Sequence, residues 1–177
     1  MPNTFLISDT HFGHEKTITT FKRADGSPLR LFDSVVEMNQ HMVHMWNRTV
    51  KDSDTVWHLG DVMWGDYFYL LHVLNGHKKL ILGNHDERIK TERWLDVFED
   101  VRGLHEFSDI ILTHIPIHPG SLRGSSNVHG HLHSNRVMHE SYKYKINPRY
   151  LCVSVEHIDY TPVSLDDVRK RLKEQQE

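Results

Sequence analysis

The sequence predicts an α/β domain in which helices cover mixed β-sheets. In the first half of the chain, short apolar runs that are typical of buried strands alternate with helical segments. The second half contains more strand-like runs than helices, a distribution that favours a layered α/β fold. At 177 residues the chain is long enough to bury a core, and we expect a single domain over residues 1–177.

The first half of the chain is expected to contain three strands and four helices. The strands are expected at 4–8, 55–59 and 78–82, and the helices at 14–23, 34–48, 66–75 and 88–99. The helix at 34–48 has the clearest signal, because Ser34 and Glu37 form a capping-box pattern and apolar residues then recur at helical spacing. Gly26 and Pro28 indicate a loop over 24–32.

Strand-like runs dominate the second half. Strands are expected at 109–112 and 151–155, a strand-like run at 127–129, and a β-hairpin over 136–146. Ser164 is a suitable N-cap for a last amphipathic helix, because Leu165, Val168 and Leu172 then lie on one face.

Composition excludes several classes of protein. A net charge of −3 predicts no broad basic surface for nucleic acid, and no apolar run approaches the roughly 18 residues of a membrane span. The first residues lack a signal-peptide pattern. The single cysteine, Cys152, lies among apolar residues and is expected to be a buried structural thiol. We therefore expect a cytoplasmic protein that does not bind membranes.

Polar motifs follow the strand-like runs in a fixed order. They are Asp9-Thr10-His11, Gly60-Asp61, Gly83-Asn84-His85-Asp86, Thr113-His114 and Gly130-His131-Leu132-His133. Open α/β sheets bind ligands beyond the carboxyl ends of their strands, so these side chains are expected to meet. Carboxylate oxygens, imidazole nitrogens and an amide oxygen suit a pair of divalent transition metals. The series predicts metal-assisted hydrolysis of a phosphate ester.

The five motifs, in this order, resemble the calcineurin-like metallophosphoesterase superfamily over positions 9–133. The segment 153–162 is similar to small single-domain members from bacteria and phages. The resemblance implies a mixed two-sheet β-sandwich flanked by helices, in four α/β/β/α layers, with two metal ions in a surface cleft.

The resemblance also implies a ligand set. The first metal would be bound by Asp9, His11 and His133. The second would be bound by Asn84, His114 and His131. Asp61 would bridge the two metals. A bridging carboxylate offers two oxygens and screens two dications that lie about 3.5–4 Å apart. An extended segment at 131–133 would point both histidines the same way, and local twist could then split them between the two adjacent metals. Mn is favoured because relatives commonly use it, and Fe, Zn, Ni or Co also suit these ligands.

Two residues of the third motif are predicted to be catalytic. The resemblance places His85 near the leaving group, where its ordinary pKa suits a general acid. Asp86 is expected to orient the His85 imidazole, and the alternative is a helix N-cap ahead of 88–99. Both roles are compatible.

Other polar and aromatic residues near the motifs are candidates for contacts with substrate. Arg88, Arg123 and His14 are the predicted substrate-binding residues, with a structural or surface role as the alternative for each. For Phe12, Trp64 and Tyr67, stacking on a nucleobase competes with packing in the core or at its rim.

The leading hypothesis is a phosphodiesterase or phosphatase that acts on a small or nucleotide substrate. The stretches between motifs leave little room for a cap domain, which favours an open cleft. The first alternative is a nuclease or RNA-end-processing enzyme, although the slightly acidic composition argues against it. The second is a non-catalytic scaffold, which the filled ligand positions disfavour. The sequence does not indicate a protein partner.

Overall fold

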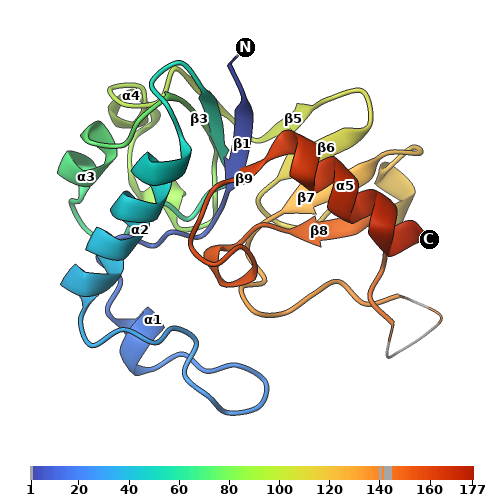
Figure 1. Cartoon of the computed structure of the whole chain (residues 1–177), viewed down its shortest axis with the longest axis horizontal. Helices are drawn as coiled ribbons and strands as arrows, with labels where there is room; N and C mark the ends of the chain where they lie inside the picture. Colours follow the sequence, from blue (N-terminus) through green and yellow to red (C-terminus); the bar gives the residue numbers. More distant parts are fainter. Residues whose placement is uncertain (1, 140, 142–144) are drawn as a thin grey trace.

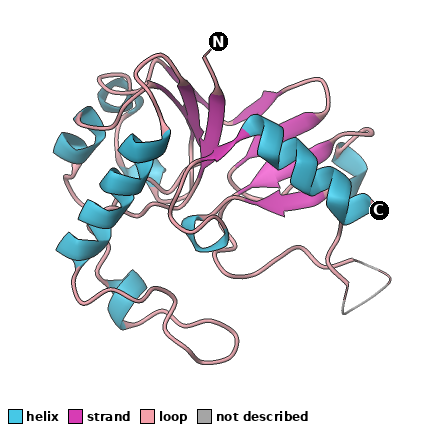
Figure 2. Cartoon of the chain, viewed as in Figure 1, coloured by secondary structure: helices cyan, strands magenta, loops and turns pink. Residues whose placement is uncertain are grey.

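Two mixed β-sheets form the centre of the fold, and helices flank them (Figures 1 and 2). The computed structural model describes residues 2–139, 141 and 145–177. The five-stranded sheet has the order β4-β3-β2-β1-β9, with bounds Asp100–Arg102, His77–Ile81, Thr55–His58, Thr4–Ile7 and Val163–Ser164. The four-stranded sheet has the order β5-β6-β7-β8, with bounds Leu104–Glu106, Ile110–Thr113, Ser126–His129 and Tyr150–Cys152.

Most neighbouring strands run parallel. β1, β2, β3 and β4 are parallel, and only β9 at the edge is antiparallel to β1. In the second sheet β6, β7 and β8 are parallel, and β5 is antiparallel to β6. In each sheet, several parallel strands therefore have their carboxyl ends on the same side. The polar motifs follow those ends.

The two sheets are joined at Ser8, directly after β1. Ser8 forms a parallel bridge with Ser154, in which the Ser8 amide donates to Val153 O and the Val155 amide donates to Ser8 O. The Ser8 hydroxyl also donates to Leu59 O at the end of β2. This junction brings the ends of β1, β2 and β8 together beside the motifs.

Helices cover the outer surfaces of the sheets. α2 (Val35–Thr49), α3 (Phe68–His72) and α4 (Thr91–Trp94) lie on one side in Figure 1, and α5 (Leu165–Gln176) contacts β1, β8 and β9. The short α1 (Lys16–Thr19) follows the first motif. One hydrophobic cluster includes fully buried residues of both sheets, among them Leu6, Val56, Leu80, Leu112 and Val128. The α/β class and the two-sheet arrangement agree with the sequence prediction.

Two expected helix boundaries are confirmed in detail. The Ser34 side chain accepts a hydrogen bond from the Glu37 amide, and the Glu37 carboxylate accepts one from the Asp33 amide. Ser164 caps α5 in the same way by accepting from the Asp167 amide. Burial of Cys152, whose Sγ lies 3.1 Å from Ser154 Oγ, is also confirmed.

The helix expected at 88–99 is wrong. The segment forms a 3₁₀ turn, Asp86–Arg88, and then the one-turn α4. Ile89 adopts extended geometry between them and packs against the core, and Trp94 and Phe98 are buried in that core. The helix expected at 66–75 is only α3. The short strands β4, β5 and β9 were not expected, since each has only two or three residues.

The hairpin expected over 136–146 falls partly outside the described residues. An antiparallel bridge joins Met138 to Ile146, and the Asn147 amide donates to Val137 O. Residues 140 and 142–144 are not described. In the rest of the chain, no helix combines the length and the apolar character needed to cross a membrane.

We expect the S34A substitution to lower the free energy of unfolding by about 1 kcal/mol, because the first turn of α2 loses its side-chain acceptor. Urea denaturation would measure the change. The matched control S53A alters an exposed serine in a turn and should leave the midpoint within error. A loss for S53A as large as that for S34A would contradict a capping effect.

Candidate metal centre

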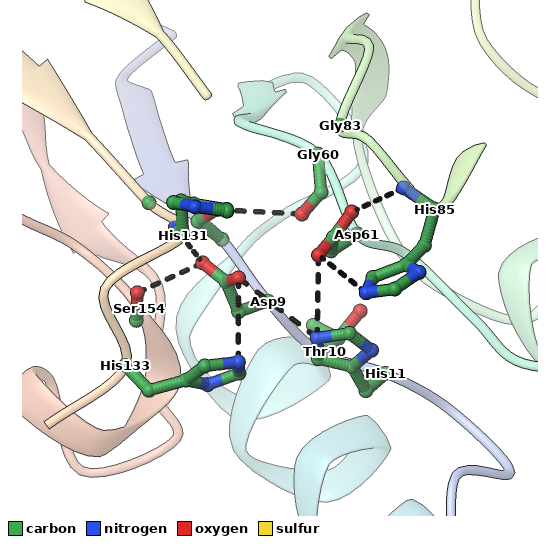
Figure 3. Close-up of polar contacts among 12 residues, drawn as sticks. Asp9, Thr10, His11, Gly60, Asp61, Gly83, His85, His131, His133 and Ser154 are labelled. Carbon is green, nitrogen blue, oxygen red and sulfur yellow. Dashed lines mark hydrogen bonds and ion pairs between the residues drawn. The ribbon is translucent and has the colours of Figure 1, made fainter. Parts of the chain in front are cut away.

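The polar motifs converge where the carboxyl ends of β1, β2, β3, β6 and β7 meet. Figure 3 shows the Asp9 and Asp61 carboxylates side by side, with histidine rings arranged around them. Two groups of side chains offer atoms that lie within 4.8 Å of one another: Asp9, His11 and His133, and Asp61, His114 and His131. The structure thus brings together Asp9, His11 and His133, the set predicted for the first metal, and places Asp61 with His114 and His131 of the set predicted for the second.

Two of the three members of the first group are buried, and the His133 side chain is 23% exposed. Asp9 and His11 follow β1 and have exposed fractions of 0% and 2%. His11 Nε2 and His133 Nε2 lie 3.9 and 4.0 Å from Asp9 Oδ1, which is too far for hydrogen bonds. The other carboxylate oxygen, Asp9 Oδ2, accepts from the Ser154 hydroxyl and the His131 amide. Asp9 Oδ1 therefore faces the histidines with its lone pairs free.

Asn84 joins the second group. Its Oδ1 lies 3.0 Å from His114 Nε2 and 3.0 Å from His131 Nδ1. The His114 Nδ1–H donates to Leu59 O over 2.7 Å, so Nε2 is left as the nitrogen that can bind a metal. A carboxylate, two imidazoles and one neutral amide oxygen are thus gathered here.

Asp61 lies between the two groups. Its Oδ2 is 3.5 Å from His11 Nε2 in the first group and 3.5 Å from His114 Nε2 in the second. Its Oδ1 accepts from the His85 amide. Asp61 therefore faces both groups, which is the placement that its predicted bridging role needs.

The backbone at the ligands is unusual. φ is 58° at Asp9, 47° at His11, 56° at Asp61, 68° at His131 and 49° at His133, all in the left-handed region. Few non-glycine residues adopt such values, and they concentrate at functional sites. The extended segment expected at 131–133 is therefore wrong. Sharp turns, rather than strand geometry, direct these two histidines into different groups.

Close backbone approach also shapes the centre. Gly60 has a φ of 88°, and a Cβ there would overlap the backbone of Gly83. A Cβ at Gly130 would overlap the Ser8 hydroxyl and the Asp9 carboxylate. Only glycine permits the motif loops to lie this close.

The donor set fits divalent cations. Among the described residues, Asp9 Oδ1 and His11 Nε2 are buried without a hydrogen-bond partner. Burial opposes protonation of His114, yet the nearby Asp61 and Asp9 carboxylates and the Leu59 carbonyl raise its pKa to about 9. Burial lowers the pKa of His11 well below its usual value, and Arg30 adds to this. Unpartnered oxygen and nitrogen atoms that face one another are the arrangement that a metal site requires.

A buried histidine beneath the centre supports the first two motifs. The Thr10 hydroxyl donates to Val62 O, so it accepts from His58 Nε2–H, while His58 Nδ1 accepts from the Gly60 amide. Both ring nitrogens are satisfied in the neutral form. Burial, with a contribution from the charge of His114, lowers the pKa of His58 to about 3.

The two predicted catalytic residues have different surroundings. The His85 side chain is about a third exposed, and its Nε2 lies 3.8 Å from Asp61 Oδ2. Asp86 is buried, and its carboxylate accepts from the backbone amides of Asp61, Val62 and Gly83. His85 Nδ1 is buried without a hydrogen-bond partner. The expectation that Asp86 orients the His85 ring is therefore not met, and Asp86 does not cap a helix at 88–99 either. Its carboxylate fastens the Gly60-Asp61 loop to the Gly83 loop.

Aromatic packing lies beside His85. The His14 ring stacks on Trp64 at 4.6 Å, the Arg88 guanidinium lies 4.4 Å over the Trp64 ring, and the His85 ring meets its edge. His14 is only 6% exposed, and burial lowers its pKa to about 4. Of the predicted substrate-binding residues, Arg88 is exposed beside Trp64, and His14 is buried against the same Trp64 ring.

Arg123 lies farther from the ligands. It lines a groove with Leu104, Glu106 and Ser121, among others, and none of these is a candidate ligand. Phe12 is fully buried, which confirms packing over substrate stacking. Tyr67 packs closely against Gly13.

Two residues that contact the ligands were not expected from the sequence. Arg30 and Glu156 form a fully buried ion pair, with Arg30 Nε 2.8 Å from Glu156 Oε1. Burial opposes ionisation of Glu156, but Arg30 and His133 together lower its pKa to about 2. Neither residue belongs to a motif, and only the tertiary structure brings them together.

Comparisons with known proteins identify relatives over nearly the whole chain. No protein-family model matches the sequence. The uncharacterized protein MJ1445 of Methanocaldococcus jannaschii is 34% identical, and the alignment covers 98% of this chain and 93% of that protein. The gene 66 protein of Mycobacterium phage L5 is 29% identical over 78% of this chain and 81% of that protein.

A solved structure has the same fold. The protein of unknown function AQ665 from Aquifex aeolicus aligns with a TM-score of 0.69 at 26% identity, covering 96% of this chain and 99% of that one. The chain belongs to the family that includes MJ1445.

We expect acid to destabilise the metal-free protein through His58. The folded-state pKa of about 3 lies below the unfolded value of 6.5, so the unfolded state binds the extra proton. The contribution of His58 is complete above pH 6.5 and falls by up to about 1.4 kcal/mol per pH unit toward pH 3.

Urea unfolding with a chelator at several pH values between 7.5 and 5 would measure this slope. In H58Q the free energy of unfolding should change less steeply with pH, by the equivalent of up to one bound proton. H72Q, at an exposed histidine, should keep the wild-type slope. Equal slopes for wild type and H58Q would refute the assignment.

Proposed function

We propose that the chain acts as one metallophosphoesterase domain that hydrolyses phosphate esters with two divalent cations. The observation that carries the proposal is the position of Asp61, whose Oδ2 lies 3.5 Å from a histidine of each ligand group. A carboxylate shared in this way implies two ions close together rather than two independent sites. The complete ligand set argues against a non-catalytic scaffold.

The proposed mechanism divides the work among the chain's own residues. Two bound cations would neutralise phosphate charge and lower the pKa of water at the centre. Asp61 holds the two positions together, and Asn84 adds an oxygen without adding charge. His85 stands beside Asp61, partly exposed to the cleft, and would donate a proton to the leaving oxygen. Its fixed backbone supports this role, because the His85 amide donates to Asp61 Oδ1.

An apolar groove next to the second ligand group favours phosphate esters with a second organic substituent, which are diesters. Asn84 and His114 line this groove together with Leu104 and Ile115, which are 50% and 51% exposed. The residues that line the groove include no lysine or arginine. Such a surface suits an uncharged organic group better than the second negative charge of a monoester.

A nuclease is the alternative, and one observation favours it. The groove that Arg123 lines shares Leu104, Thr113 and Ile117 with the apolar groove. The two form a longer track that leads away from the ligands, which would accommodate a chain of nucleotides. Glu106 lies in the same track and reduces its positive charge.

The identity of the ions and the location of the protein stay predictions. We favour Mn, with Fe, Zn, Ni or Co as alternatives, because nitrogen and oxygen ligands of this kind accept all of them. We also retain the expectation of a cytoplasmic protein.

The function is tested by assaying metal-stripped protein on bis-p-nitrophenyl phosphate and p-nitrophenyl phosphate in parallel. Mn, Zn, Mg or no metal would be added. We expect Mn-dependent hydrolysis with a higher kcat/KM for the diester, because the groove accepts its second organic group. Preference for the monoester would overturn the diesterase assignment, and inactivity on both with two ions bound would count against catalysis.

We expect H85A to lower kcat about 10²- to 10⁴-fold while two equivalents of metal remain bound, because His85 belongs to neither ligand group. Metal content by elemental analysis and kcat would be measured on the same samples. H72A, at an exposed histidine, is the control. D61A should lose metal instead, and an unchanged kcat for H85A would remove the general-acid role.

A further inference from the structure

A buried ion pair outside the motifs makes direct contact with the first ligand group. Glu156 lies in the 3₁₀ turn Val155–His157 that comes after β8, and Arg30 lies in the loop before α2. Both side chains have an exposed fraction of 0%. They are 126 residues apart in sequence, with Arg30 Nε 2.8 Å from Glu156 Oε1.

The carboxylate of this pair also accepts from a ligand histidine. Glu156 Oε1 lies 3.2 Å from His133 Nδ1. An ionised carboxylate can only accept hydrogen bonds, so the hydrogen of the neutral His133 ring is on Nδ1. Nε2 then carries the lone pair, and it is Nε2 that faces Asp9 Oδ1. A carboxylate behind a histidine in this way fixes the ring and raises its basicity toward a metal.

The guanidinium of the pair holds the backbone of the other ligands. Arg30 Nη1 donates to Thr10 O over 2.9 Å, and Arg30 Nη2 donates to Asp9 O over 2.5 Å. These carbonyls belong to the left-handed turn that carries Asp9 and His11. The Arg30 guanidinium thus fixes the turn that bears Asp9 and His11, and the Glu156 carboxylate fixes the ring of the third ligand, His133.

The net stability of such a pair is a poor explanation for its presence. Burying two charges costs solvation energy that their attraction often fails to offset, so apolar residues of the same size are commonly as stabilising. The positions of the contacts are more informative. Apart from a 3.5 Å contact of Arg30 Nη1 with Met38 Sδ, the polar contacts that Arg30 and Glu156 make outside the pair lead to His133 or to the backbone of Asp9 and Thr10.

We propose that Arg30 and Glu156 are positioning residues for the first metal, setting the tautomer of His133 and the backbone turn at Asp9. The proposal rests on the metal centre of the proposed function. It predicts that the pair controls affinity at the first ligand group and leaves the second group nearly unaffected.

The test measures Mn binding by titration calorimetry in two backgrounds. In H131A the second group is disabled, so the first group is measured. In H133A the first group is disabled, so the second is measured. We expect E156Q to weaken binding about 10- to 100-fold in the H131A background and less than about 2-fold in the H133A background. R30K should act in the same direction, because lysine keeps the charge but cannot contact both carbonyls.

Controls separate positioning from general loss of structure. D109N breaks the exposed ion pair of Asp109 with Arg169, away from the motifs, and should leave both affinities unchanged. Unchanged affinity at the first group in E156Q would overturn the proposal, and so would equal losses at both groups. Failure of the parent H131A and H133A proteins to bind Mn, Zn or Co would instead count against the metal centre itself.

Discussion

The left-handed backbone at the ligands is the constraint on which the rest of the centre depends. Five of the seven residues predicted to be ligands have φ values between 47° and 68°. For most side chains this conformation costs on the order of 1–3 kcal/mol, although Asp and His tolerate it better than β-branched residues. Such a cost persists only where the surroundings hold the turn in place. The centre is therefore a set of strained turns maintained by fixed contacts.

Two buried charged groups provide much of that support, and both act on backbone atoms. Asp86 accepts from amides of the Asp61 turn and the Gly83 loop. Arg30 donates to carbonyls of the Asp9 turn. Asp86 thus stabilises one turn by accepting from its backbone amides, and Arg30 stabilises the other by donating to its backbone carbonyls. Together with neutral His58, they hold the first two motifs in one place.

The sequence predicted the parts of the centre that depend on local pattern. Strand-like runs that end in Asp, Asn or His were visible, and Ser34 with Glu37 marked the start of α2 correctly. The sequence could not show the left-handed turns, because Asp and His also occur in ordinary loops. It assigned Asp86 to its sequence neighbour His85, whereas the carboxylate contacts amides 25 and 24 residues away. Arg30 and Glu156 carry no motif, so only folding reveals that they meet.

Each ligand group combines residues from both sheets. Asp9 and His11 follow β1 of the five-stranded sheet, whereas His133 follows β7 of the four-stranded sheet; in the second group, Asp61 follows β2 and His114 follows β6. An ion bound to either group would act as a cross-link between the two layers, much as a disulfide joins distant segments. At a free concentration 100 times its dissociation constant, one such ion would add about 2.7 kcal/mol to the free energy of unfolding. The ions of the proposed centre would thus also set how readily the layers separate, so the protein would unfold more readily in a metal-poor environment.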